Sequence, residues 1–175
     1  DLFDVVAGYV HSTQVLGQPL MELLPDRLQS WEKLIKTGMD LVICLIVLAA
    51  GLPLWLLIAL AVKLDSPGPV FYRQTRVGKG GREFSIIKFR SMVKDAETGS
   101  GAVWADRNDS RVTRVGALLR KTRLDEVPQI LNILAGHMSL VGPRPERPEI
   151  IVRLRKVFPF YDKRLTIKPG LTGWA

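Results

Sequence analysis

The sequence is poor in sulfur, since its 175 residues include one cysteine, Cys44. A single cysteine excludes a disulfide framework and a multi-cysteine zinc site. The glycine-rich stretch 78–81 is not followed by the Lys-Ser or Lys-Thr of a phosphate-binding loop, and no βαβ pattern surrounds it. The basic residues form no nucleic-acid-binding motif with stacking aromatics, which disfavours a nucleic-acid partner. With 47% hydrophobic residues, the chain is also not a disordered one.

Charge is missing from one long segment. Between Asp40 and Lys63 lie 22 uncharged residues, most of them Leu, Ile, Val and Ala. As a helix they would reach ~33 Å, against ~30 Å for the hydrocarbon core of a bilayer. No amphipathic period is visible, so we predict a membrane helix. The alternative is a buried helix of a soluble protein.

Pro53 lies near the middle of this segment and predicts a kink, because proline removes one backbone donor and clashes with the preceding turn. Both flanks of the segment are basic, with Lys33 and Lys36 before it and Lys63 and Arg73 after it. Positively charged flanks favour the cytoplasmic side of a membrane. A bent helix that enters and leaves by the same face satisfies both observations, while a kinked spanning helix stays open.

Acidic and basic residues are unequally divided along the chain. Residues 1–65 hold four Lys/Arg and seven Asp/Glu, a net charge of −3, whereas the remaining residues hold 21 and ten, a net charge of +11. A basic rear half suits an anionic partner, which means nucleic acid, an anionic membrane surface or phosphorylated small molecules.

After the apolar segment the pattern predicts a β-hairpin and three helices. Residues 70–77 and 83–90 read as strands joined by the glycine turn. Helices are expected from Asp109 or Ser110 to about Thr122, from about Asp125 to Ala135, and from Glu146 to about Phe158. The predicted fold class is therefore α+β, mostly α, with amphipathic basic helices suited to a membrane surface.

The densest chemistry lies in the segment Arg120-Lys-Thr-Arg-Leu-Asp-Glu126, where two adjacent carboxylates follow a cluster of cations at a predicted helix start. The helix dipole and the guanidinium groups should keep Asp125 ionised and lower its pKa. Such a carboxylate could bind Mg²⁺ or attack phosphorus. On spacing alone, N-capping by Asp125 with an exposed Glu126 is the commoner role, and both interpretations stay open.

Several motifs together resemble the monotopic phosphoglycosyl transferases, the bacterial sugar transferase family. They cover about residues 32–175 in the family's order. The motifs are the apolar helix with a central proline and the segments Ser66–Gly78, Phe84–Met92, Leu124–Leu134, Met138–Pro145 and Ile167–Ala175.

The resemblance implies transfer of a sugar-1-phosphate from a nucleotide diphosphate sugar to a polyprenol phosphate in the membrane. Asp125 would be the nucleophile and form a covalent phosphosugar intermediate, with Glu126 as its partner in the dyad and Mg²⁺ beside Asp125. The family's phosphate-binding cations map onto Lys88, Arg120 and Arg144, with Arg76 and Arg90 as further candidates. The plain alternative for each cation is a solvated or lipid-facing charge.

The resemblance also implies an architecture and a location. It predicts a tail of an upstream domain and a linker over residues 1–30, a re-entrant membrane helix over 31–65, and a C-terminally truncated catalytic domain over 66–175. The catalytic part would lie on the cytoplasmic face of the bacterial inner membrane and start exopolysaccharide, capsule or O-antigen (lipopolysaccharide) assembly. The expected donor is a UDP-hexose. The resemblance allows the protein to be either a monomer or a homo-oligomer.

A competing hypothesis is a non-catalytic, membrane-anchored module that binds anionic lipid head groups. It explains the division of charge and the amphipathic helices. It does not explain an Asp-Glu pair inside the basic cluster, because acidic residues weaken binding to anionic lipid.

Overall fold

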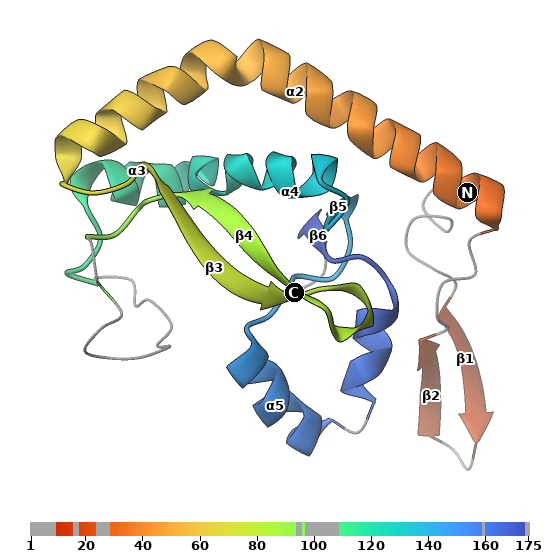
Figure 1. The fold of residues 1–175 in the computed structure, drawn as a ribbon. Coiled ribbons are helices and arrows are strands. Elements are labelled where there is room, and N and C mark those ends of the chain that lie inside the picture. The colour runs from red at the N-terminus through yellow and green to blue at the C-terminus, as the bar shows by residue number, and fades with distance from the viewer. Residues whose placement is uncertain are drawn as a thin grey trace. The chain divides into compact units, whose positions relative to one another are not determined.

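The computed structural model describes residues 10–15, 18–23, 29–93, 96, 109–158 and 160–173 (Figure 1). Their contacts divide the chain into two units. Unit 1 comprises Asp1–Leu41, Arg76–Phe84 and His137–Ala175, and unit 2 comprises Val42–Thr75 and Ser85–Gly136. The described part is mostly helical, as the sequence predicts, and has three two-stranded sheets, of which the sequence predicted only the hairpin of residues 70–77 and 83–90.

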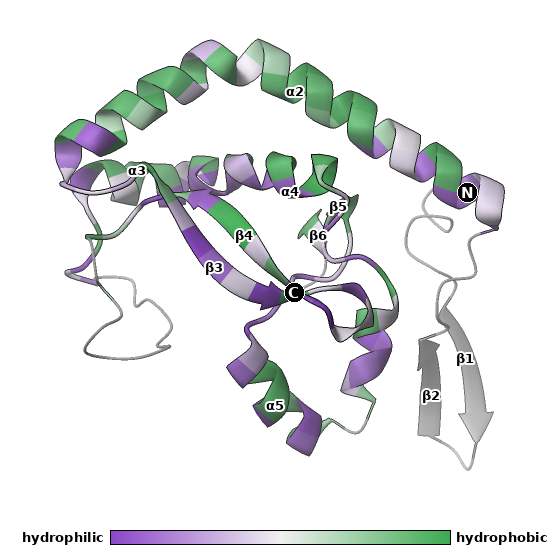
Figure 2. Ribbon diagram, in the orientation of Figure 1, coloured by the Kyte–Doolittle hydropathy of each residue, from purple (hydrophilic) through white to green (hydrophobic). Residues whose placement is uncertain are grey.

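The longest element is the helix α2, Ser30–Asp65, which contains the uncharged segment and runs through Pro53 without interruption (Figure 1). Figure 2 shows that its middle is apolar and its ends are polar. Only a narrow stripe of it is buried, formed by Cys44, Trp55, Ile58 and Val62. In the described chain it is the one helix long and apolar enough to cross a membrane, and 17% of its apolar window is buried. It is therefore not covered as the core helix of a soluble protein would be.

Unit 1 contains two small sheets. Strands β1, Val10–Val15, and β2, Gln18–Leu23, pair antiparallel within the region for which the sequence predicted only a tail and linker. Strands β5, Ser139–Val141, and β6, Gly170–Thr172, pair in parallel. A Cβ atom on Gly170 would lie 2.1 Å from the backbone nitrogen of Gly142, so this pairing requires glycine. The helix α5, Pro148–Val157, and the 3₁₀ helix η3, Tyr161–Thr166, complete the unit.

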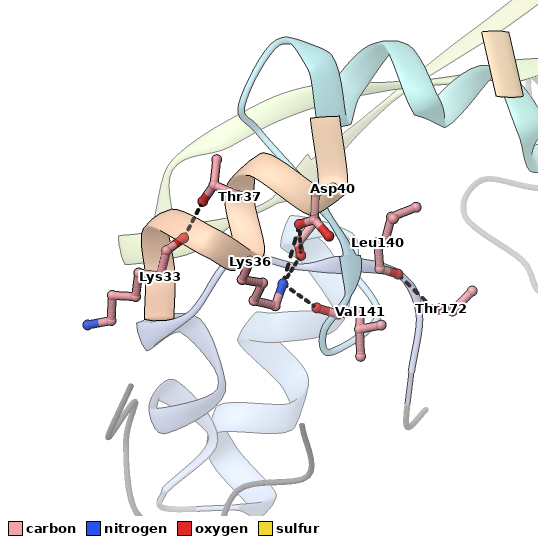
Figure 3. A network of polar contacts seen from close by, with 8 residues as sticks. Lys33, Lys36, Thr37, Asp40, Leu140, Val141 and Thr172 are labelled. Carbon is pink, nitrogen blue, oxygen red and sulfur yellow. Dashed lines mark hydrogen bonds and ion pairs between the residues drawn. The ribbon is translucent and has the colours of Figure 1, made fainter. Parts of the chain in front are cut away.

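A part-buried polar network joins the start of α2 to β5 (Figure 3). Ser139 Oγ donates to Asp40 Oδ2 at 2.6 Å and accepts a hydrogen bond from Lys36 Nζ. Lys36 Nζ also lies 3.3 Å from Asp40 Oδ2. Ser139 is 3% exposed, so its hydroxyl has no ready replacement by water.

Ser139→Ala is expected to lower the free energy of unfolding by about 1–3 kcal/mol, because it removes the donor to a largely buried carboxylate. Denaturant unfolding of the detergent-solubilised protein measures this. Thr172→Ala, which removes only an exposed hydroxyl that donates to the carbonyl of Leu140, serves as the control. Equal stability of the Ser139 and Thr172 variants would contradict the expectation.

The predicted hairpin is confirmed and consists of β3, Phe71–Val77, and β4, Glu83–Phe89. The 3₁₀ turn η1, Lys79–Gly81, joins them, and Gly80 has a φ of 68° that favours glycine. In unit 2, Phe89 of β4 stacks on Phe71 with a ring-centroid distance of 5.4 Å, and Trp55 of α2 meets it edge-on at 6.1 Å. Phe89 and Trp55 are buried in the core of unit 2, where their contact holds β4 against α2, while Phe71 is exposed.

The helix α3, Arg114–Thr122, begins later than the sequence predicted. Thr113 is its N-cap and accepts from the backbone nitrogen of Gly116, so the prediction of Asp109 or Ser110 as the cap was wrong. Asp109 instead accepts from the Arg111 backbone and guanidinium. A Cβ on Gly116 would lie 2.1 Å from the carbonyl oxygen of Ser91, so glycine allows α3 to approach the backbone there.

The predicted helix from Asp125 to Ala135 consists of two shorter elements, the 3₁₀ helix η2, Leu124–Gln129, and the α-helix α4, Ile130–Leu134. Pro128 explains the difference, because it has no N–H to donate to the carbonyl of Leu124, four residues earlier. The α-helical pattern begins only after it. The helix α5 agrees with its prediction to within two residues.

Candidate active site

The carboxylate dyad lies at a sharp turn in unit 2. Arg123, in the left-handed conformation with a φ of 60°, separates α3 from η2 and places Asp125 and Glu126 in the first turn of η2. Asp125 is 8% exposed, and the Glu126 side chain is 13% exposed. Neither carboxylate is therefore a solvated surface group, and the alternative of an exposed Glu126 was wrong.

Lys88 of β4 forms an ion pair with Glu126. The Lys88 Nζ atom donates to Glu126 Oε1 at 2.7 Å, and the two side chains are 19% and 13% exposed. The structure thereby brings together two residues that are 38 positions apart in sequence. The pair leaves Asp125 as the carboxylate of the dyad that has an oxygen without a hydrogen-bond partner in the described chain.

Asp125 is a buried carboxyl group with an unsatisfied oxygen. Its Oδ1 atom has no hydrogen-bond partner in the described part of the chain. Burial raises the pKa of Asp125 above its ordinary value, and Lys88 and Arg120 oppose this while Glu126 adds to it. The prediction of a lowered pKa was thus wrong, because desolvation outweighs the neighbouring cations. A buried, poorly solvated carboxylate is a stronger nucleophile and a better partner for an incoming cation or phosphorus than a solvated one.

The raised pKa predicts how stability depends on pH. The protonated form of Asp125 is favoured in the folded state, so its contribution is present at low pH and is lost as pH rises through the folded-state pKa. At pH 7 without Mg²⁺, Asp125→Asn should therefore unfold at a higher temperature than the wild type. The difference should shrink as pH is lowered toward 4. Thermal unfolding in EDTA measures this, and a less stable variant at pH 7 would contradict it.

Asn132 of α4 is a site residue that the motifs did not single out. Its Oδ1 accepts from the backbone nitrogen of Ile87 at 3.0 Å, and its Nδ2 donates to the carbonyl of Ser85 at 2.7 Å. It is 3% exposed. The available signal was one amide side chain within the otherwise apolar segment Ile130–Leu134.

Arg90 lies in unit 2 but binds backbone rather than the dyad. Its Nη2 donates to the carbonyls of Val62 and Ser66, at 3.2 and 2.6 Å, and so satisfies the C-terminal end of α2. It is 5% exposed. Arg120, in the last turn of α3, is part-exposed and acts on the charge of Asp125.

Two other predicted cations belong to unit 1. Arg76 donates to the carbonyl of Pro145 at 3.1 Å and lies 3.7 Å from Glu146, so it holds the Pro-Arg-Pro connector. Arg144 is exposed, and its carbonyl accepts from Arg164. Unit 2 thus brings together Asp125, Glu126, Lys88 and Arg120.

The residues present fit Mg²⁺ only with ligands from a substrate. The described residues contain no group of three or more His, Cys, Asp or Glu that could hold a metal ion. Mg²⁺ in phosphoryl-transfer sites is commonly held by one or two carboxylates, with waters and phosphate oxygens completing the octahedron. The unpartnered Oδ1 of Asp125 would provide one such ligand.

Comparison with known proteins places this geometry in a family of transferases. The family model described as "Bacterial sugar transferase" matches residues 31–175. The chain therefore belongs to the bacterial sugar transferase family, the family that its motifs resemble.

Two of the relatives are named as undecaprenyl-phosphate sugar phosphotransferases, and a third is named for exopolysaccharide production. A UDP-N-acetylgalactosamine-undecaprenyl-phosphate N-acetylgalactosaminephosphotransferase of Aeromonas hydrophila is 44% identical over 98% of this chain. A UDP-glucose:undecaprenyl-phosphate glucose-1-phosphate transferase of Escherichia coli (strain K12) is 45% identical over 100%. The chain spans 40% and 38% of the length of these two relatives. It spans 72% of the exopolysaccharide production protein PSS of Rhizobium leguminosarum bv. phaseoli, which is 43% identical over 81% of this chain.

Proposed function

We propose that the chain carries the catalytic part of an enzyme that transfers a sugar-1-phosphate from a nucleotide diphosphate sugar to a polyprenol phosphate. The observation that carries this proposal is the buried, unpartnered Oδ1 of Asp125, which lies among cations in a chain of the bacterial sugar transferase family. The alternative role of Asp125 as a helix N-cap is wrong, because Arg123 occupies the N-cap position of η2 and Asp125 lies inside its first turn.

In the first step the Asp125 carboxylate attacks the phosphorus that bears the sugar. The new bond joins Asp125 to that phosphorus, and the bond to the nucleoside monophosphate breaks, with the electron pair leaving on the nucleotide oxygen. In the second step an oxygen of the polyprenol phosphate attacks the same phosphorus and releases the carboxylate. The products are polyprenyl-diphospho-sugar and nucleoside monophosphate.

The charges around the dyad suit an anionic substrate. A carboxylate and a diphosphate repel each other, and Lys88 and Arg120 offset that repulsion at the point of attack. Bound Mg²⁺ would supply further charge neutralisation for the phosphate oxygens, with Asp125 as its protein ligand. Glu126 holds the Lys88 ammonium in place through their ion pair and assists in positioning or proton transfer.

The three other predicted cations, Arg144, Arg76 and Arg90, have different roles in this proposal. Arg144 is exposed, and we propose that its side chain contacts a phosphate group. Arg76 acts mainly by holding the connector that carries Arg144. Arg90 commits one guanidinium nitrogen to the end of α2, and its Nε and Nη1 atoms are buried without a partner in the described chain, so it is the weakest of the candidate substrate cations.

The apolar exposed surface supports a membrane location. We propose that α2 enters and leaves the bilayer by the cytoplasmic face with a kink at Pro53, and that residues 66–175 form the catalytic domain after a tail and linker over 1–30. On α5 and just after it, Val152, Val157 and Phe158 are exposed beside basic residues, which suits an anionic membrane surface (Figure 2). A homo-oligomer is compatible with this arrangement.

The relatives' names support a donor class and an acceptor class. UDP-glucose and UDP-N-acetylgalactosamine appear in two of them, and undecaprenyl phosphate in both. We therefore propose a UDP-hexose donor, an undecaprenyl phosphate acceptor and a place at the start of exopolysaccharide, capsule or O-antigen assembly.

The test is incubation of the full-length protein with undecaprenyl phosphate, Mg²⁺ and a panel of labelled UDP-sugars. Release of UMP with one of them, together with a lipid-linked labelled sugar, is the expected result. Release of UDP would contradict the reaction type, because it means that the sugar moved without its phosphate. Binding to anionic vesicles without either product would favour the lipid-binding module instead.

A further inference from the structure

The outer edge of β4 is closed by a side chain rather than by a strand. The hairpin sheet has two strands, β3 and β4, so the backbone of β4 that faces away from β3 has no strand partner in the described chain (Figure 1). Asn132 fills this place with one acceptor and one donor, at Ile87 and Ser85 respectively. A carboxamide is chemically a peptide group, so it reproduces the bonds that a third strand would make.

We call these two hydrogen bonds the Asn132 clamp. The clamp joins β4, which carries Lys88, to α4, which follows the dyad-bearing η2. Lys88 directly follows Ile87, whose nitrogen the clamp holds, and α4 directly continues η2, which carries Asp125 and Glu126. The two clamp bonds flank Ile86, a core residue with 3% exposure. A shift of β4 along α4 would therefore move the Lys88 stem relative to the dyad.

We infer that Asn132 is a positioning residue that sets the Lys88–Glu126 ion pair, and through it the charge environment of the attacking carboxylate. This inference rests on the proposed function and deepens it. Lys88 Nζ reaches Glu126 Oε1 at 2.7 Å from the place in β4 next to Ile87, whose backbone nitrogen Asn132 holds. A displacement of about 1 Å at a reacting site can cost up to about 100-fold in rate.

A double-mutant cycle with Asn132→Ala and Lys88→Met in the full-length protein tests the inference. If Asn132 acts through Lys88, the loss in the rate of UMP release for the double variant should equal that for Lys88→Met alone. Asn132→Ala alone should lose about 10- to 100-fold. Asn132→Asp keeps the acceptor for Ile87 and should recover part of this loss. If the Asn132→Ala variant does not fold, Asn132→Asp replaces it in the cycle with Lys88→Met.

Ile133→Ala is the matched control, because Ile133 is equally buried in α4 but its side chain makes no polar contact with β4. It should lose stability yet keep its rate of UMP release at temperatures where it is folded. Fully additive rate losses in the cycle would overturn the inference, and so would an equal rate loss in Ile133→Ala.

The denaturation midpoints of the same four proteins, the wild type, the two single variants and the double variant, give a second cycle that requires no enzyme activity. Coupling between Asn132 and Lys88 in this measurement supports the clamp even if no UDP-sugar is turned over, and in that case only the proposed function fails. Additive shifts of the midpoint would contradict the inference whatever the activity. Coupling in the midpoint together with additive rate losses would show a purely structural role and would also contradict it.

Discussion

Asp125→Asn is expected to abolish sugar-phosphate transfer, with UMP release falling by about a thousandfold or more. The amide has nearly the shape of the carboxylate but no anionic oxygen to bond to phosphorus. The substitution should leave the fold unchanged, because Oδ1 of this 8% exposed residue has no hydrogen-bond partner to lose in the described chain. Initial rates with a labelled UDP-sugar measure the effect.

The matched control is Asp162→Asn. Asp162 is an exposed carboxylate that pairs with Arg155 at 2.7 Å in unit 1, so its loss should leave the rate within about twofold. Membrane association of both variants should equal that of the wild type. If Asp125→Asn kept a tenth or more of the wild-type rate, Asp125 could not be the nucleophile.

Lys88→Met should produce the second large effect, a loss of about 100- to 1000-fold in kcat/KM. The change removes a cation that favours the ionised form of Asp125 and leaves Glu126 without its ion-pair partner. The pair is mostly buried, so the variant should also lose about 2–4 kcal/mol of unfolding free energy. Steady-state kinetics and denaturant unfolding measure the two losses.

Two further variants separate the loss of charge from the loss of stability. Lys88→Met combined with Glu126→Gln removes both charges and should regain most of the stability while transfer stays low. Lys88→Arg keeps the charge and should retain more activity than Lys88→Met, although the guanidinium has a different shape. Recovery of wild-type activity in the double neutral variant would show that Lys88 acts only on the fold.

Local sequence patterns predicted the parts of the fold that local chemistry determines. The hairpin followed from alternating residues on either side of a glycine turn, and α5 followed from its apolar period after Pro148. The apolar stretch of α2 was evident from its missing charges. Each of these signals lies within a few neighbouring residues, so no knowledge of distant contacts was needed.

Predictions from the sequence were wrong or missing where the structure depends on contacts between residues far apart in the chain. The pKa of Asp125 depends on its burial under the rest of unit 2, which the adjacent arginines do not reveal. The Lys88–Glu126 pair and the Asn132 clamp each join residues about forty positions apart. Arg90 resembled a substrate cation in sequence, yet its Nη2 binds the carbonyls at the end of α2.

Some local patterns fit more than one structure, and the start of α3 and the helix type before Pro128 were therefore predicted wrongly. Asp109, Ser110 and Thr113 are all good N-cap residues, and in the structure it is Thr113 that caps α3, next to the close approach of Gly116 to Ser91. Pro128 was compatible with the first turn of an α-helix, but the turn before it is 3₁₀. Such choices differ by about 1 kcal/mol and are settled by packing.

The central claim is that Asp125 bonds covalently to the phosphorus of the donor. Intact-protein mass spectrometry of the full-length enzyme, incubated with a UDP-sugar and Mg²⁺ but without polyprenol phosphate, measures this bond directly. We predict a mass increase of one phosphosugar, mapped to Asp125 by peptide analysis, lost on addition of polyprenol phosphate and missing in Asp125→Asn. An active enzyme with no such adduct, or with the adduct on another residue, would contradict the account.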